Sequence, residues 1–350
     1  MRVTVSNPFG VAFLPCPRRP SICQRGAGCG NVSFWFYRPW WRAGPFARLP
    51  QEDPIAPINL SPIGEGDGAL DLRDTTVAAL VNHPRFDTAM AIVAEATVEL
   101  YRGQWVLNRL VSDRGRFIVA LMILDLHFVE GGGAGFTIAR LRSEAVAHGV
   151  CSPGRVTALL ASLRLLGFLK PVAAEDQRER RLAPTDRFLA LHRERWQRHF
   201  EAIALLRPEG EAALAALDRP AFLGAFAHAL VNFYRDGLRM FELVPALRPI
   251  GERDAGMVVL LSLLIAAPTG DPVPIAALAR RFSVSRAHVL TVLREAAELG
   301  LVQPSGPRGG YRAGPRLTTA FRRFFATMLL VQLHGIESAR GAGALATSTI

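Results

Sequence analysis

Apolar residues recur three and four positions apart over long stretches of the chain after residue 75, with polar residues between them. This spacing places the apolar side chains on one face of a helix. It predicts long helices over residues 86–111, 113–129, 185–206, 209–217 and 221–241. Two short extended runs begin at Phe168 and at Leu301, each directly after a glycine. The pattern therefore predicts a mainly α-helical protein with small β-hairpins.

One short element occurs twice in this pattern, and its copies lie 133 positions apart. They are SPGRVTALLASLRLLGFLKP, which begins at Ser152, and SRAHVLTVLREAAELGLVQP, which begins at Ser285. The leading serine can cap a helix, because its hydroxyl accepts a hydrogen bond from an unpaired backbone N–H. Gly167 and Gly300 stand where each helix should end, since glycine adopts the left-handed conformation without strain. The same offset is expected to continue beyond the copies, to the pairs Thr185/Thr318 and Phe188/Phe321.

A second short helix is predicted before each copy, over residues 138–148 and 274–282, with a tight turn after it. Helix, tight turn and capped second helix form the helix-turn-helix unit, whose second helix enters the DNA major groove. The segments 170–184 and 303–317 are each long enough for two strands and a loop that carries arginines. The sequence therefore predicts tandem winged helix-turn-helix domains joined by long helices, with the small β-hairpins as wings.

Positive charge is concentrated on the two copies. The chain has a formal net charge of +11, from 41 Lys and Arg against 30 Asp and Glu. Residues 145–190 carry a net +3 from seven basic and four acidic residues, and residues 278–323 carry a net +7 from nine and two. Duplex DNA is a dense array of phosphate charges, which basic side chains neutralise. Double-stranded DNA is therefore the expected partner.

The first copy and its flanks resemble the MarR family of bacterial winged-helix regulators over about residues 85–206. The matching residues are Ser152-x-x-x-Val156-Thr157-x-Leu159, Leu163-x-x-x-Gly167-Phe168-Leu169, Asp176-x-Arg178-x-Arg180 and Pro184-Thr185. The chain departs from the family at Asp186, since the family has a glycine shortly after the threonine. The second copy lacks the Asp/Arg loop and matches only a generic winged helix.

The resemblance implies a transcriptional regulator that dimerises through its terminal helices. It also implies a small-molecule effector, aromatic in character, in the cleft between the first winged domain and the dimer helices. Because this chain carries two winged domains, a homodimer of two-headed subunits and a monomeric pseudo-dimer both remain open, and the homodimer is favoured.

Candidate DNA contacts are the outward positions at the start of each capped helix and the arginines of the loops. They are Ser152, Gly154, Arg155, Thr157, Ala158, Arg178, Arg180, Arg181, Ser285, Arg286, His288, Thr291, Arg308 and Arg312. Arg155 and Arg286 can pair with guanine O6 and N7, and Thr157 and Ala158 can contact a thymine methyl. The loop arginines are expected to contact phosphates or the minor groove, which positions the protein without specifying sequence.

The composition shifts along the chain predict five regions. They are a disordered N-terminal extension or a segment before the true start codon (1–74), a MarR-like domain with a dimer-type helix (75–184), a helical linker or dimerisation region (185–247), a second winged domain (248–336) and a flexible tail (337–350). The first region holds three of the four cysteines, at spacings that do not match a zinc site.

Other function classes find less support in the sequence. There is no phosphate-binding lysine loop and no dinucleotide-binding glycine motif, so we expect no enzymatic activity and no cofactor. His192 and His199 are seven positions apart on one helix, which favours surface or interface histidines over a metal site. The longest apolar runs are too short to span a bilayer, so a cytoplasmic, nucleoid-associated protein without membrane contact is predicted. The alternatives are a plasmid replication or partition protein and a chromosome-organising scaffold that binds proteins.

Overall fold

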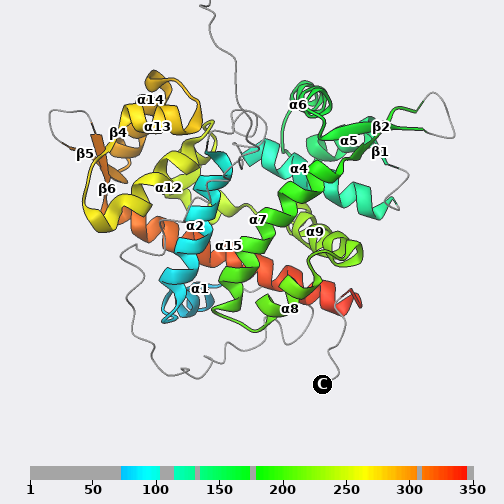
Figure 1. Cartoon of the computed structure of the whole chain (residues 1–350), viewed down its shortest axis with the longest axis horizontal. Coiled ribbons are helices and arrows are strands. Elements are labelled where there is room, and N and C mark those ends of the chain that lie inside the picture. The colour runs from blue at the N-terminus through cyan, green and yellow to red at the C-terminus, as the bar shows by residue number, and fades with distance from the viewer. Residues whose placement is uncertain (1–71, 103–113, 131–134, 174–178, 306–309, 345–350) are drawn as a thin grey trace, which may run out of the picture. The chain divides into compact units, whose positions relative to one another are not determined.

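The computed structural model describes residues 72–102, 114–130, 135–173, 179–305 and 310–344 (Figure 1). Within them the chain is mainly helical and holds two antiparallel sheets of three strands each. Nearly all of the predicted N-terminal extension lies outside the described residues. None of the described helices is both long enough and apolar enough to cross a membrane.

The first half of the described chain, residues 74–204, runs from a short helix to a long one. Its elements are α1 (Asp74–Val81), α2 (Phe86–Tyr101), α4 (Arg114–Val129), β1 (Phe136–Thr137), α5 (Ile138–Ala147), α6 (Pro153–Leu165), β2 (Leu169–Val172), β3 (Arg181–Pro184) and α7 (Asp186–Ala204). We call residues 114–184 of this half head 1.

The second half, residues 209–341, repeats the same series, with three short helical segments between α9 and α12 and one more after α12. Its elements are α8 (Glu209–Ala216), α9 (Pro220–Arg235), α10 (Met240–Leu243), η3 (Pro245–Leu247), α11 (Arg248–Gly251), α12 (Gly256–Ala266), η4 (Ala267–Thr269), β4 (Val273–Pro274), α13 (Ile275–Phe282), α14 (Arg286–Glu298), β5 (Val302–Ser305), β6 (Gly310–Ala313) and α15 (Pro315–Gly341). We call residues 256–313 head 2.

The two sheets have the same topology, with strand orders β1-β3-β2 and β4-β6-β5. Their registers also correspond. In head 1, Thr137 faces Arg181 and Leu169 faces Pro184, whereas in head 2, Pro274 faces Gly310 and Val302 faces Ala313. The internal repeat therefore extends beyond the helix and strand seen in the sequence to the whole head.

The halves pack reciprocally, so that the helices of one half cover the head of the other. Helix α2 of the first half contacts α12 of head 2, and α9 of the second half contacts α4 of head 1 (Figure 1). In the same way α1 lies against α15, and α8 lies against α7. Each half thus supplies helices that bury the apolar surface of the other.

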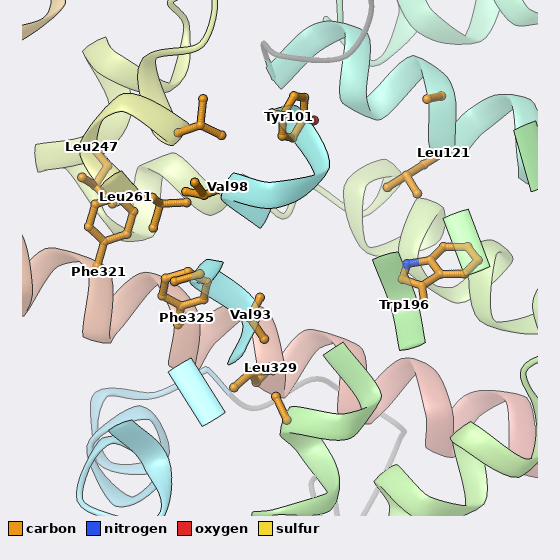
Figure 2. Close-up of a cluster of buried hydrophobic side chains, with 14 of the residues drawn as sticks. Val93, Val98, Tyr101, Leu121, Trp196, Leu247, Leu261, Phe321, Phe325 and Leu329 are labelled. Atoms are coloured by element: carbon orange, nitrogen blue, oxygen red, sulfur yellow. The ribbon is translucent and has the colours of Figure 1, made fainter. Parts of the chain in front are cut away.

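The core is continuous across these contacts. Figure 2 shows Val93 and Val98 of α2 beside Phe321 and Phe325 of α15, all of them buried. On the other side Trp196 of α7, 2% exposed, packs edge-on against Phe226 of α9 at 5.0 Å between ring centroids. Burial of large apolar side chains on both sides makes the hydrophobic effect the main force that joins the halves.

Three predicted helix boundaries differ from the structure. Helix α2 ends at Tyr101 rather than continuing to residue 111, because Arg102 is extended, and residues 103–113 lie outside the described residues. Helix α9 ends at Arg235, since Gly237 turns the chain with φ +97°. Helix α15 continues to Gly341, so the first residues assigned to a flexible tail are helical.

The gapless offset of 133 holds only as far as the hairpin. The backbone N–H of Thr185 donates to the Phe168 carbonyl at 2.9 Å, and the N–H of Gly314 donates to the Leu301 carbonyl at 2.8 Å. The counterpart of Thr185 is therefore Gly314, and the expected pairs Thr185/Thr318 and Phe188/Phe321 were wrong. The physical reason is loop length, because eight residues separate β2 from β3 and only four separate β5 from β6.

Candidate nucleic-acid interface

Helix α6 begins and ends as its sequence predicts. The Ser152 hydroxyl accepts a hydrogen bond from the Arg155 backbone N–H at 3.4 Å, and Pro153 occupies the first turn, where no N–H is required. Gly167 follows the helix with φ +72°. The apolar stripe is buried, as listed here: Val156, Leu159, Leu160 and Leu163. One face of α6 is thereby fixed against head 1, and its opposite face is left to solvent.

Helix α14 has the same construction. Ser285 accepts a hydrogen bond from the His288 backbone N–H at 3.1 Å, and Gly300 follows the helix with φ +70°. Its buried stripe is Val289, Val292, Leu293 and Ala296. The two capped helices lie on the same side of the helical framework, at the top of the view in Figure 1.

Most candidate contacts on the two capped helices are exposed. They are Ser152, Gly154, Arg155, Thr157 and Ala158 on α6, and Ser285, Arg286 and Thr291 on α14. His288 is only partly exposed, because its Nε2 lies 2.7 Å from the Asp254 carbonyl oxygen. A helix N-terminus also carries partial positive charge, so both helices present a surface suited to an anion.

The candidate arginines of the loops fall into three groups. Arg180 and Arg312 are exposed on the hairpins. Arg178 and Arg308 lie outside the described residues. Arg181 is engaged within the protein, since it contacts Glu179 at 3.0 Å and Glu130 at 3.1 Å and donates to the Gly135 carbonyl at 2.8 Å. Arg181 therefore ties the first hairpin to Glu130, the residue that follows α4.

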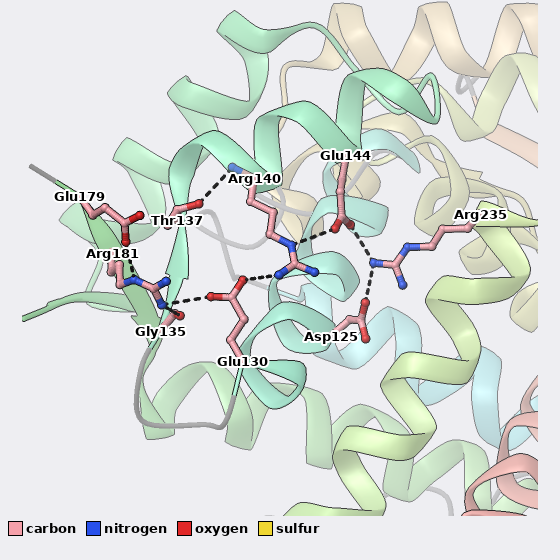
Figure 3. A network of polar contacts seen from close by, with 9 residues as sticks. All are labelled: Asp125, Glu130, Gly135, Thr137, Arg140, Glu144, Glu179, Arg181 and Arg235. Atoms are coloured by element: carbon pink, nitrogen blue, oxygen red, sulfur yellow. Dashed lines mark hydrogen bonds and ion pairs between the residues drawn. The ribbon is translucent and has the colours of Figure 1, made fainter. Parts of the chain in front are cut away.

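Arg181 is one end of a network of charges that crosses head 1 (Figure 3). Glu130 also pairs with Arg140 of α5 at 2.9 Å, and Arg140 contacts Glu144 one turn later at 3.4 Å. Glu144 then pairs with Arg235 of α9 at 2.7 Å. The network thus connects the hairpin of head 1 to a helix of the second half.

Its innermost member is Asp125, which is 1% exposed in the middle of the apolar α4. Its carboxylate lies 2.7 Å from Arg235 and 2.7 Å from Nδ1 of His228, both on α9. The Arg235 contact is close enough for an ion pair but does not have hydrogen-bond geometry. A buried carboxylate without such partners would be strongly destabilising. The sequence analysis missed this site, although a lone acid inside an apolar run was its visible signal.

A shallow open hollow lies beside this network, where α4, α7 and α9 meet. Its volume is about 570 Å³, and its lining includes His127, Phe128, Leu189, Arg193 and His228. The Nδ1 atom of His127 and the Nε atom of Arg193 are buried there without a hydrogen bond among the described residues, and the Asp218 carboxylate is 3.8 Å from Arg193. Burial, followed by the charge of Lys170, lowers the pKa of His127, so its ring is neutral near pH 7.

His192 and His199 are buried, so the surface alternative of the prediction was wrong and both lie where α7 contacts neighbouring elements. His192 stacks between Phe188 and Trp196, and His199 Nδ1 lies 3.0 Å from the side-chain oxygen of Gln332 on α15. Burial, followed by the charge of Arg195, lowers the pKa of His192 well below its usual value and that of His199 to about 3. Both rings are therefore neutral and belong to the contact between α7 and its neighbours.

In the part of the chain that the structure describes, no three His, Cys, Asp or Glu side chains are grouped so that they could hold a metal ion. No protein-family model matches the chain, and neither a curated protein nor a solved structure matches it.

Proposed function

We propose that the chain is a site-specific DNA-binding regulator of transcription, in which head 1 and head 2 are winged helix-turn-helix domains. Helices α6 and α14 would enter the major groove, and the two hairpins would be the wings. The observation that carries this proposal is that two capped helices of the same construction expose their N-terminal positions on one side of the molecule. Head 1 would be the MarR-like one.

The charge distribution supports the same proposal. Arg286, Arg294, Arg312 and Arg316 are exposed, and none of them forms an ion pair with another described residue. Basic side chains without an internal acidic partner are available to phosphates, and their contribution to binding falls steeply with salt.

We further propose that the hollow beside α4, α7 and α9 is where a small aromatic effector binds. It lies between head 1 and helices that connect the halves, as the family resemblance implies. Its apolar wall and two buried nitrogen atoms without hydrogen bonds suit a flat ligand with a polar or acidic group. Such a ligand would contact His228 and, through Asp125, the charge network of head 1.

The test is to mix the full chain with sheared genomic DNA of its source at about 150 mM salt and to sequence what is retained. A few sharp peaks that share a motif are expected. Broad or absent retention would contradict site-specific recognition and favour a scaffold that binds proteins.

Two variants separate sequence recognition from general affinity. Arg155→Ala should relax base preference, since Arg155 lies where a helix contacts base edges, and Arg180→Ala should weaken binding to all sequences about equally. Equal selectivity profiles for the two variants would overturn that division of roles.

A further inference from the structure

We propose that a single copy of the chain occupies a complete DNA site and that the two halves of this site differ in sequence. The inference rests on the proposed function. It adds the stoichiometry of the complex and the asymmetry of its target.

The first step is that the contacts that hold two heads together are supplied within one chain. Helix α2 covers head 2, α9 covers head 1, and α7 meets α15 at the buried His199–Gln332 contact. The side chains at these contacts, such as Val93, Phe226 and Phe325, are almost completely buried. The chain therefore does not require a second copy to bring α6 and α14 onto one face.

The second step concerns symmetry. A regulator made of two identical copies presents the same helix twice, and for this reason its target is a palindrome. In this chain the helices α6 and α14 superpose position by position at an offset of 133, from Ser152/Ser285 through Gly167/Gly300. The two helices are built alike, but they are separate segments of one chain and each can carry its own outward residues. The DNA sequences that they recognise therefore need not be the same.

The third step is that the exposed positions of the two helices differ. From the cap onward, the exposed or partly exposed pairs are Pro153/Arg286, Gly154/Ala287, Arg155/His288 and Ala158/Thr291, whereas Leu290, opposite Thr157, is partly buried against the core. Base identity in the major groove is recognised by the donors, acceptors and methyl contacts of such side chains. The serine caps are the same, but Pro153/Arg286, Arg155/His288 and Ala158/Thr291 differ in their donors and apolar contacts, so we expect the two half-sites to differ.

Stoichiometry is tested first, with the full chain and a duplex recovered from the genomic selection. We expect a monomer without DNA and one chain per duplex in sedimentation or native mass measurements. Two chains on one recovered site would overturn the inference and leave the proposed function intact.

Asymmetry is tested with three duplexes of equal length: the recovered site with its half-sites A and B, a palindrome of A and a palindrome of B. The recovered site should bind at least about tenfold more tightly than either palindrome, because one half of each palindrome is mismatched for its helix. Equal or tighter binding to one palindrome would overturn the inference. Absence of sequence-selective binding to any duplex would overturn the proposed function as well.

Matched variants assign each half-site to its helix. Arg155→Ala should change base preference in one half-site only, and Arg286→Ala in the other only. The controls are Arg164→Ala and Arg294→Ala, which remove the same charge from exposed positions near the far end of each helix. The controls should weaken binding without changing base preference. A change of preference in both half-sites from either N-terminal variant would contradict the assignment.

Discussion

The two heads share an apolar framework and differ in the charges placed around it. Each head has a capped helix, a glycine stop and a three-stranded sheet of the same order. Head 1 and α9 add a network of charged side chains, and the counterparts in head 2 do not reproduce it. The paired positions are Asp125/Ser262, Glu130/Ala267, Arg140/Ala277, Glu144/Arg281 and Arg181/Gly310.

This difference shows which features are needed to build a head and which are not. Head 2 forms the same sheet and the same capped helix without the network, so the fold rests on apolar periodicity, caps and glycine stops. The network is an addition that ties the hairpin and α5 of head 1 to α9. It adds charged contacts to the apolar ones by which α9 holds head 1.

The largest effect should come from the centre of this network. Asp125→Ala leaves Arg235 and His228 without their buried partner, whereas the counterpart change Ser262→Ala removes one hydroxyl that bonds to its own helix at 2.8 Å. We expect a loss of about 3–5 kcal/mol for Asp125→Ala and about 1 kcal/mol or less for Ser262→Ala. Urea unfolding of both variants measures the difference, and equal losses would show that the network contributes no special stability.

The next largest effect should be a loss of stability in acid, which arises from His199 in the first half. Because the pKa of His199 is lowered to about 3 in the folded protein, below pH 6.5 the unfolded chain binds a proton that the folded chain does not. Stability should therefore fall as the pH drops from 6.5 toward 3, by up to about 1.4 kcal/mol per pH unit for this residue.

The second half supplies a control substitution for that effect. Helices α7 and α15 correspond at an offset of 129, which makes Met328 the counterpart of His199. His199→Met should flatten the dependence of unfolding free energy on pH, and the difference between variant and parent cancels the carboxylates that titrate in both. If the unfolding free energies of variant and parent changed in parallel with pH, His199 would take up its proton equally well in the folded protein.

The repeat was predictable from sequence because its determinants are local. Ser152, Gly167 and their counterparts act on backbone atoms a few residues away, so the sequence analysis located both capped helices and both hairpins. The full extent of the duplication was not recognised from the sequence, and the packing partners far apart in the chain make it plain. The α2 and α9 helices correspond in contacts, and at an offset of 133 they also share identical residues, such as Val98 with Val231 and Tyr101 with Tyr234, a signal that the sequence analysis missed.

The candidate site was predictable only in part, for a related reason. Exposure of the α6 positions follows from the helical period, and it agrees with the structure. The engagement of Arg181 by Glu130 joins residues 51 positions apart, which no local pattern indicates. In the same way, the sequence left His199 between a surface and an interface, because its partner Gln332 is 133 positions away.

Removing either serine cap should lower the unfolding free energy by a smaller amount, and by the same amount in both heads. This prediction tests the features that the two heads share. Ser152→Ala and Ser285→Ala each remove one hydroxyl that accepts from a backbone N–H, at 3.4 and 3.1 Å. Each should cost about 1 kcal/mol in unfolding free energy. Thr319→Ala on α15, where the hydroxyl only returns to its own helix at 3.3 Å, is the matched control and should cost less. Losses that differ strongly between the two serines would contradict equal construction.

The smallest difference should appear between two ion pairs in corresponding places, where α9 meets α5 and α2 meets α13. In the first, Arg235 on α9 meets Glu144 at 2.7 Å. In the second, Glu99 on α2 is 4.0 Å from Arg281, which is the counterpart of Glu144. Burial, followed by the charge of Arg102, lowers the pKa of Arg281, which indicates that its partner compensates it poorly.

Double-mutant cycles with alanine at both positions of each pair measure the two coupling energies. We expect about 1 kcal/mol for Glu144 with Arg235 and less than about 0.5 kcal/mol for Glu99 with Arg281, since an exposed, long ion pair contributes little. The short pair should also keep its coupling at high salt, because it is better shielded from solvent. Equal energies would show that the two ion pairs hold their heads equally well despite their different lengths. If they differ as expected, head 1 is the more firmly held head, and head 2 has more freedom to move against the helices that cover it.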